Sequence, residues 1–303
     1  MAQYGEYLLN GILFGSTYSL VAIGFTIIFG TIHRLNVAHG ATIMVAAFAG
    51  ATTSILLGGA DSYLALGLAF VASVATGALL GVLVELVAFR PLRDASYLTP
   101  FVTTIAVTII LEELFLKLSR SVPIFYPEYT PFPSILEDLS FEVGGMYIRG
   151  VYLVTFIVSL ALMVVLHLWI TRTRSGRAVR VVEENPDVAR LLGIDVRRVE
   201  VTVFAVASAL AGAAGCLIGM SVGTVSPFMG SHLLLIGFVA IVLGGLGNVY
   251  GAMIGGILVG VIETVTVGVL AATYREAFLF AVLFLTLVLK PEGILAAGSA
   301  GRD

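Results

Sequence analysis

Long apolar segments alternate with short polar connections along almost the whole chain. A helix that crosses the hydrocarbon core of a membrane needs roughly 20 predominantly apolar residues. Segments of about this length predict membrane helices at residues 7–30, 38–58, 62–89, 98–119, 149–170, 200–222, 231–247, 251–270 and 276–290. The break GGLGNVYG between the seventh and eighth segments fits either a turn outside the membrane or the tip of a re-entrant segment. We therefore expect eight to ten transmembrane or broken helices.

Composition agrees with this pattern. Of the 303 residues, 59% are hydrophobic and only 12% are charged, and the mean hydropathy is +1.06. A soluble domain has far more charged surface than this. We predict an all-α, polytopic membrane protein with a single transmembrane domain over residues 1–303.

Basic residues predict the orientation of the chain, because Lys and Arg are retained on the cytoplasmic side of membrane helices. The connection at residues 171–199 is by far the most basic part of the sequence. It contains Arg172, Arg174, Arg177, Arg180, Arg190, Arg197 and Arg198. This places 171–199 in the cytoplasm and the connection 120–148 on the periplasmic side. With nine crossings the N-terminus is periplasmic and the C-terminus is cytoplasmic.

The periplasmic connection 120–148 is acidic, which agrees with that orientation. It contains Glu128, Glu137, Asp138 and Glu142 against Arg120.

Small residues recur every four positions in three of the apolar segments. The rows are Gly11, Gly15 and Ser19; Ala207, Ala211, Gly215, Gly219 and Gly223; and Gly256, Gly260, Thr264 and Gly268. Rows of this kind let neighbouring membrane helices approach closely. Packing within one chain is the simplest interpretation, and contact between subunits or a pore-lining surface are the alternatives.

The stretch ENPDVARLLGI, residues 184–194, predicts a very short helix with a signal at each end. Asn185 suits the N-cap, and Pro186 suits the first helical position because its missing N–H would be unpaired there. Gly193 suits the left-handed position that follows a helix. Asp187 in the first turn and Arg190 in the last complement the helix dipole.

Val188, Leu191 and Leu192 form one apolar stripe on this short helix. So short a helix is marginal in water, so the stripe must bury against something. The preceding RSGRAVRVVEE also predicts a helix. One interpretation is an amphipathic helix on the membrane surface, with arginines at anionic lipid. The other is a docking element that fits a groove on a soluble partner.

The segment TRSGRAVRVVEENPDVARLLGIDVRRV resembles the cytoplasmic coupling loop of the permeases of branched-chain amino acid ABC importers. Further stretches resemble the same family in the same order along the chain. They are NGILFGSTYSLVAIGFTIIFGTIHRLNVAHG, FRPLRDASYLTPFVTTIAVTIIL, FVAIVLGGLGNVYGAMIGGILVGVIE and KPEGI. Together they cover most of the chain, and its compact length resembles the shorter of the two permease subunits in such importers.

The resemblance implies an assembly in a bacterial inner membrane. Its other parts are a second related permease chain, two cytoplasmic ATPase subunits and a periplasmic substrate-binding protein. The sequence holds no G-x-x-x-x-G-K-[ST] phosphate loop, so ATP and Mg are expected on the partner subunits. We expect this chain to be a transport subunit rather than an enzyme, with no cofactor of its own, contact with membrane lipid and no nucleic-acid partner.

The implied substrate is a branched-chain amino acid. Permeases of the same type that carry urea, amides or carboxylates are an alternative. An ion-coupled secondary transporter, with broken helices at the membrane midplane, is another.

The resemblance assigns contact with the ATPase to the region from Arg177 to Gly193. Ala189 and Gly193 match the Ala-x-x-x-Gly core of the family's coupling helix, and the entry ENP matches as well. The residues expected to couple the chain to the ATPase are Arg177, Glu183, Glu184, Asn185, Pro186, Asp187, Ala189, Arg190 and Gly193.

Three residues are candidates for the translocation path or a subunit seam. Asn36 and His39 belong to NVAHG, which matches the family's turn after its first helix, and their alternative role is to cap the second apolar segment. Ala41 follows where the family often has Glu, so a polar network that uses this carboxylate would be altered here. Glu263 lies deep in an apolar segment, where a charge usually faces a cavity or a partner. Its alternative role is a buried hydrogen-bond anchor.

Other ionisable residues point to structural roles. Glu113 and Lys117 are spaced to pair on one helix, and Glu85 lies near Arg90 in the sequence. No His/Cys cluster has the spacing of a metal site, and no nucleophile–base set predicts catalysis. We expect neither metal ligands nor catalytic residues.

Overall fold

The computed structural model describes residues 2–58, 62–93, 95–96, 98–121, 129–136, 139–143, 146–290 and 293. Glu128, Glu137 and Asp138 of the predicted acidic connection lie outside these residues, as does the side chain of Glu142.

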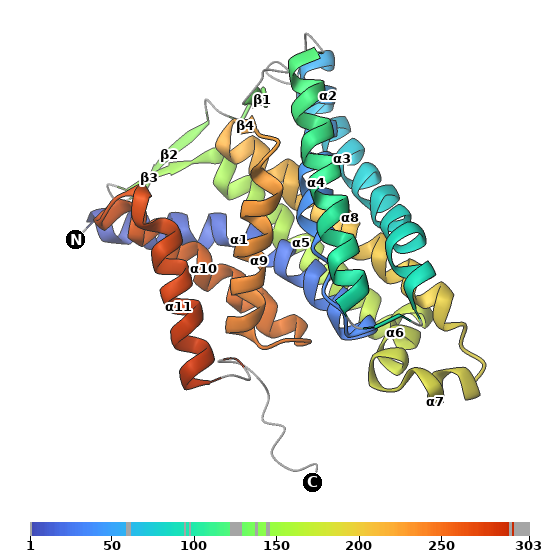
Figure 1. Ribbon diagram of the computed structural model, residues 1–303. Coiled ribbons are helices and arrows are strands. Elements are labelled where there is room, and N and C mark those ends of the chain that lie inside the picture. The colour runs from blue at the N-terminus through green and yellow to red at the C-terminus, as the bar shows by residue number, and fades with distance from the viewer. Residues whose placement is uncertain are drawn as a thin grey trace.

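Each predicted apolar segment corresponds to one helix of the bundle (Figure 1). These helices are α1 (Ala2–Ile32), α2 (Ala38–Leu57), α3 (Tyr63–Val84), α4 (Leu98–Ser121), α5 (Gly150–Arg172), α8 (Val196–Val222), α9 (Met229–Gly244), α10 (Val249–Val269) and α11 (Arg275–Leu289). Among the described residues, seven helices are long and apolar enough to cross a membrane. The predicted all-α polytopic class is confirmed. The other two are α4, which carries four charged residues near its end, and α9, which has 16 residues.

Two short helices, α6 (Arg174–Glu184) and α7 (Pro186–Leu191), lie together at one end of the bundle, at the lower right of Figure 1. We call this the arginine-rich end. Helix α3 reaches the same end through a π-helical segment (η1, Glu85–Phe89) and a 3₁₀ turn (η2, Arg90–Leu92).

The opposite end, which we call the strand end, carries two small antiparallel sheets. Strand β1 (Thr130–Pro131) pairs with β4 (Thr224–Val225), and β2 (Ser140–Val143) pairs with β3 (Met146–Arg149). The sequence predicted only a loop at 120–148. The strands are too short for a periodic pattern, and their pairing satisfies backbone groups of the connection.

The GGLGNVYG break is a closed turn between adjacent helices. Gly245 and Gly247 have φ of 96° and 82°, values that glycine adopts without steric cost. The Asn248 side chain then caps α10 by accepting from the Gly251 N–H at 3.1 Å. Helix α9 rises only about 24 Å at 1.5 Å per residue, short of the roughly 30 Å hydrocarbon core. The pair therefore consists of one partial helix and one full-length helix.

Helix α1 is the central element of the bundle and packs against α10, α8, α9 and α5. Its small-residue row faces the row on α10. A Cβ added to Gly15 would lie 2.9 Å from the Ile257 carbonyl oxygen, and one added to Gly260 would lie 2.7 Å from the Gly11 carbonyl oxygen. The Ser19 hydroxyl donates to the Met253 carbonyl at 2.5 Å. These two rows therefore pack within the chain, as the simplest interpretation predicted.

The third row also packs inside the molecule. A Cβ on Gly215 would lie 3.2 Å from the Ile43 side chain of α2, and one on Gly219 would lie 2.8 Å from the Phe132 ring. Close approach of α8 thus fixes both α2 and the connection at the strand end.

The small-residue rows of α1 and α10 lie in close contact. Adding one methyl group in this contact should therefore destabilise the protein more than adding one at an open position. Gly260→Ala should lower the unfolding stability by about 1–3 kcal/mol because the new Cβ meets backbone atoms of α1. Gly67→Ala is the matched control, since Gly67 is a helical glycine with nothing near its Cβ position. The measurement is the thermal unfolding midpoint of the purified protein in detergent. Equal midpoints for the two variants would contradict the close contact between α1 and α10.

Candidate functional site

Helices α6 and α7 are joined by a single residue at the arginine-rich end. Asn185 ends α6, with its N–H donating to the Val181 carbonyl at 3.0 Å. Its side-chain oxygen starts α7 by accepting from the N–H groups of Asp187 and Val188 at 3.0 and 3.1 Å. Pro186 occupies the first turn, as the sequence predicts. The joint is therefore fixed by local hydrogen bonds.

The other end of α7 closes with a Schellman motif. Gly193 has φ of +78°, the Ile194 N–H donates to the Ala189 carbonyl and the Gly193 N–H donates to the Arg190 carbonyl, both at 3.0 Å. Arg190 also pairs with Asp187 at 2.6 Å on the helix surface. Both predicted caps are confirmed, so hydrogen bonds close α7 at each end.

The apolar stripe of α7 is exposed in this chain. Leu191 is 87% exposed, Leu192 67% and Val188 45%, whereas Ala189 is fully buried against the bundle. Glu184, Asn185 and Arg190 surround the stripe and are exposed as well, and Arg177 is exposed on α6. Apolar side chains grouped in this way and rimmed by polar ones are typical of an interaction surface.

Glu183 is a predicted coupling residue whose charged side chain turns toward the bundle. The Glu183 carboxyl packs against Gly30 near the end of α1. Burial raises the pKa of this carboxyl above its ordinary value. Glu183 therefore connects α6 to the central helix.

A polar cavity of about 850 Å³ separates α7 from the ends of α1, α3 and α8. Arg93 in its wall pairs with Glu85 at 3.4 Å and with Glu200 of α8. The sequence suggested Arg90 as the neighbour of Glu85, but the turn after η2 lets Arg93 reach back instead. Arg34 donates to the Leu92 and Arg93 carbonyls at 2.8 Å and holds this turn in place.

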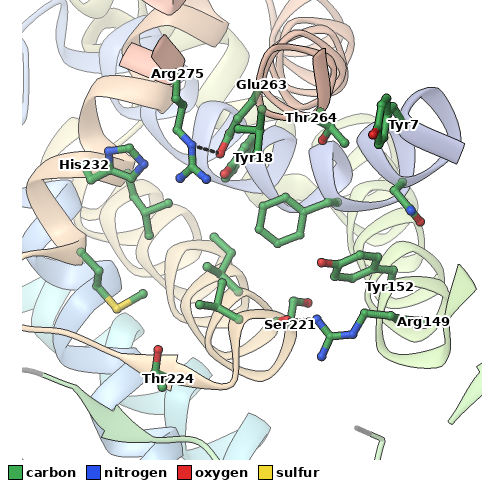
Figure 2. A pocket seen from close by; sticks show the side chains of 18 of the residues that line it. Tyr7, Tyr18, Arg149, Tyr152, Ser221, Thr224, His232, Glu263, Thr264 and Arg275 are labelled. Carbon is green, nitrogen blue, oxygen red and sulfur yellow. Dashed lines mark hydrogen bonds and ion pairs between the residues drawn. The ribbon is translucent and has the colours of Figure 1, made fainter. Parts of the chain in front are cut away.

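A second cavity, of about 610 Å³, opens at the strand end (Figure 2). On one side, Arg275 of α11 pairs with Glu263 of α10, with Nε and Oε1 3.1 Å apart. Tyr18 of α1 and His232 of α9 lie beside this pair. Glu263 is nearly buried, and its Oε2 has no hydrogen-bond partner in the described part of the chain.

The facing side of this cavity is formed by the start of α5 and the end of α8. Arg149 donates from Nη1 to the Ser221 carbonyl at 3.2 Å, and its guanidinium carbon lies 5.4 Å from the centre of the Tyr152 ring. The lining also holds apolar side chains, which include Phe14, Ile218, Val222, Leu233 and Val267.

Of the three path or seam candidates, only Glu263 lines either cavity. His39 is fully buried, edge-on to Phe25 at a ring distance of 5.8 Å. Asn36 is buried at the start of α2, where its carbonyl accepts from the His39 N–H at 3.3 Å. The structure therefore brings Asn36 and His39 together in the core and separates both from Glu263.

Sequence reasoning missed Arg149, Tyr152, Arg275 and Tyr18 as lining residues of the strand-end cavity. A signal was present for the two arginines. They stand at the strand end, on the side opposite the basic connection, where the positive-inside bias disfavours them. A basic residue retained against this bias is a candidate for a local role.

Further pairs of ionisable side chains lie on α4 and between α9 and α11. Glu113 and Lys117 pair at 4.0 Å on the surface of α4, as expected. His232 lies 3.6 Å from Glu276. Within the described residues, no group of three His, Cys, Asp or Glu side chains is placed to hold a metal ion.

Comparison with solved structures finds a chain of similar fold. The chain superimposes on PsaBC from Streptococcus pneumoniae, solved in complex with a Fab, with a TM-score of 0.51 over 98% of this chain and 94% of that one. Only 12% of the residues are identical, so this likeness concerns the fold alone.

Sequence comparison is more specific. The chain is 35% identical to the high-affinity branched-chain amino acid transport system permease protein BraD of Pseudomonas aeruginosa, over 97% of this chain and 96% of the relative. It is 33% identical to the corresponding LivH protein of Salmonella typhimurium, over 96% and 94%. Residues 7–287 match the family model described as the permease component of the branched-chain amino acid transport system. The chain belongs to this family of membrane permeases.

Proposed function

We propose that this chain is a transmembrane subunit of an ATP-driven importer that carries branched-chain amino acids into the cytoplasm. The observation that supports this most is α7, a helix capped at both ends that presents Leu191 and Leu192 to the surrounding water. A lone chain gains nothing from such exposure, whereas an ATPase subunit with a matching groove would bury both side chains. The names of the relatives supply the substrate class.

In the proposed assembly, ATP and Mg are bound by two cytoplasmic ATPase subunits. A second related permease chain and a periplasmic binding protein complete the importer in a bacterial inner membrane. The arginine-rich end then faces the cytoplasm, with the N-terminus outside and the C-terminus inside. The strand-end cavity opens toward the binding protein.

Movement of α7 has a direct route into the bundle. Asn185 joins α7 to α6, and Glu183 of α6 contacts Gly30 of α1. Helix α1 runs without a break from there to Tyr18 and Phe14, which line the strand-end cavity. A shift of the coupling helices would therefore change the cavity by displacing one continuous helix, a form of alternating access.

An ion-coupled transporter is the second candidate, and the partial helix α9 beside the Glu263–Arg275 pair is the observation that favours it. The exposed apolar stripe of α7 favours the importer instead.

The proposed function predicts strict ATP dependence. Proteoliposomes that contain this chain, its partner permease, the ATPase subunits and the binding protein should accumulate leucine only when ATP is supplied to the ATPase side. The purified chain alone should accumulate none on an imposed Na⁺ or H⁺ gradient. Gradient-driven uptake by the chain alone would refute the importer.

The cap of α7 predicts a specific loss of coupling. Gly193→Val should strain the left-handed residue that closes α7, so ATP hydrolysis should continue while leucine uptake falls severalfold. Gly58→Val is the matched control, because Gly58 closes α2 at the strand end with φ of +68° and equally open surroundings. The measurement is the ratio of leucine transported to ATP hydrolysed. Equal ratios in the two variants would contradict the coupling role of α7. The Ala189→Pro substitution disrupts the same helix independently and should lower the same ratio.

The partly buried Glu183 carboxyl predicts a pH-dependent contact between α6 and α1. Its raised folded-state pKa means that its contribution to stability is complete below the unfolded value of about 4.3 and is lost as the pH rises through the folded value. Glu183→Gln should therefore raise the thermal unfolding midpoint relative to the parent protein at pH 7.5 and raise it less at pH 5. Glu184→Gln, at the exposed neighbour, should leave the midpoint nearly unchanged. A Glu183→Gln effect that is the same at both pH values would contradict the burial.

A further inference from the structure

The polar cavity of about 850 Å³ beside α7 has an excess of positive charge, and we call it the arginine cavity. Among the described residues, its charged lining residues are Arg34, Arg90, Arg93, Arg190 and Arg197 against Glu85, Asp195 and Glu200. Five cations against three anions leave two positive charges in excess. A concave site lined in this way concentrates anions.

The carboxylates of the arginine cavity already have partners within the chain. Glu85 and Glu200 both pair with Arg93. Asp195 pairs with Arg198 at 3.0 Å. These three carboxylates are therefore engaged by other arginines than the two described next.

Arg90 and Arg197 are the arginines of the cavity that keep their donors unused. Within the described residues, neither side chain forms an ion pair or donates a hydrogen bond, and both are exposed. A guanidinium has five N–H donors in a fixed fork that matches the oxygens of a phosphate. Two such forks at one cavity indicate a site for a phosphate group.

The contact between the η2 turn and α8 brings these two arginines to the same place. Arg93 reaches across to Glu200 of α8. Arg90 lies one turn before Arg93, and Arg197 lies one turn before Glu200 on the same helix face. Burial lowers the pKa of Arg93 most, and repulsion from Arg197 and Arg90 lowers it further. The guanidinium groups are therefore close enough to repel one another, and an anion among them would relieve this repulsion.

The length of α3 and the turns that follow it sets the depth of Arg90 in a membrane. The apolar span Tyr63–Leu92 has 30 residues, which rise about 45 Å at 1.5 Å per residue. The hydrocarbon core is only roughly 30 Å thick, and the membrane with its headgroup layers is roughly 40–45 Å. The last turn of the span, which holds Arg90, therefore lies in a headgroup layer.

An exposed apolar row leads along the same span toward Arg90. Leu79, Leu83 and Val87 are spaced four residues apart, and each is more than half exposed. Side chains at this spacing share one face of a helix. An acyl chain lying along this row would bring its phosphate to Arg90, which is also exposed. The row favours a phosphate that belongs to a lipid over one that is free in solution.

We propose that the arginine cavity binds the phosphate group of an anionic membrane lipid through Arg90 and Arg197, with an acyl chain along the exposed row of α3. Basic pockets between membrane helices are typical sites for such headgroups. The assignment goes beyond the proposed function and does not depend on the transported substrate. Pro186 and Arg190 of α7 line the same cavity, so the bound headgroup lies against α7.

The test is equilibrium binding of phosphatidylglycerol with a fluorescent acyl chain to the purified full-length chain in neutral detergent, at physiological ionic strength. Arg90→Gln and Arg197→Gln should each weaken binding about fivefold, the usual effect of one basic residue on an anionic lipid. The unlabelled competitors are phosphatidylglycerol, phosphatidylcholine and inorganic phosphate. Phosphatidylcholine has no net charge and inorganic phosphate has no acyl chain, so both should displace the probe severalfold more weakly than phosphatidylglycerol does.

Matched variants separate this effect from general damage and from bulk charge. Arg174→Gln removes an exposed arginine of α6 that does not line the cavity, and it should bind the lipid like the parent protein. Arg90→Lys keeps the charge but loses the fork, so its affinity should lie between those of the parent protein and Arg90→Gln. The thermal unfolding midpoint should stay nearly unchanged in all these variants, because the substituted side chains are exposed.

Equal phosphatidylglycerol affinity in the parent protein, Arg90→Gln and Arg197→Gln would overturn the site. Equal displacement by phosphatidylcholine would also overturn it, and displacement by inorganic phosphate as strong as that by phosphatidylglycerol would assign the cavity to a soluble anion instead.

The ATPase subunits provide one more contrary outcome. If Arg90→Gln and Arg197→Gln keep their lipid affinity but no longer retain the ATPase subunits on purification, the cavity receives an acidic segment of the ATPase and the lipid assignment fails. These results would leave the importer function standing. Absence of ATP-driven leucine uptake by the parent assembly would refute the proposed function and leave the lipid site standing.

Discussion

The backbone contact between α1 and α10 is the constraint on which the rest of the arrangement depends. Gly15 and Gly260 leave no room for a Cβ, so the two helices lie as close as their backbones allow. This contact fixes Tyr18 of α1 beside Glu263 of α10 and forms one side of the strand-end cavity. The same continuous helix carries Gly30 to Glu183 at the arginine-rich end. Both candidate regions are therefore positioned by one element.

A second constraint concerns the stability of α7 at the arginine-rich end. A helix as short as α7 does not form on its own in water. Here Asn185 and Gly193 satisfy the free backbone groups at its ends, and Ala189 anchors it to the molecule. Because these few contacts hold α7 in place, Leu191 and Leu192 are left exposed. Helix α7 is thus held at both ends while its apolar stripe stays exposed.

Local features were predictable from the sequence, and long-range ones were not. The caps of α7, the small-residue rows and the apolar segments depend on residues a few positions apart, so their spacing alone predicted them. The strand-end cavity is lined by Arg149, Tyr18 and Arg275, which are remote in sequence and share one cavity because α1 packs against both α5 and α10. The pairing of Glu85 with Arg93 rather than Arg90 likewise depends on how the chain turns after η2. The inward turn of Glu183 required the position of Gly30, which no local pattern contains.

The reactivity of a Leu191→Cys thiol toward a water-soluble maleimide tests docking through α7 most directly. Cys216 is fully buried and should stay silent. The thiol at 191 should react rapidly in the isolated membrane subunit and far more slowly once the ATPase subunits are bound. Equal rates in the isolated subunit and the assembled transporter would contradict docking through α7.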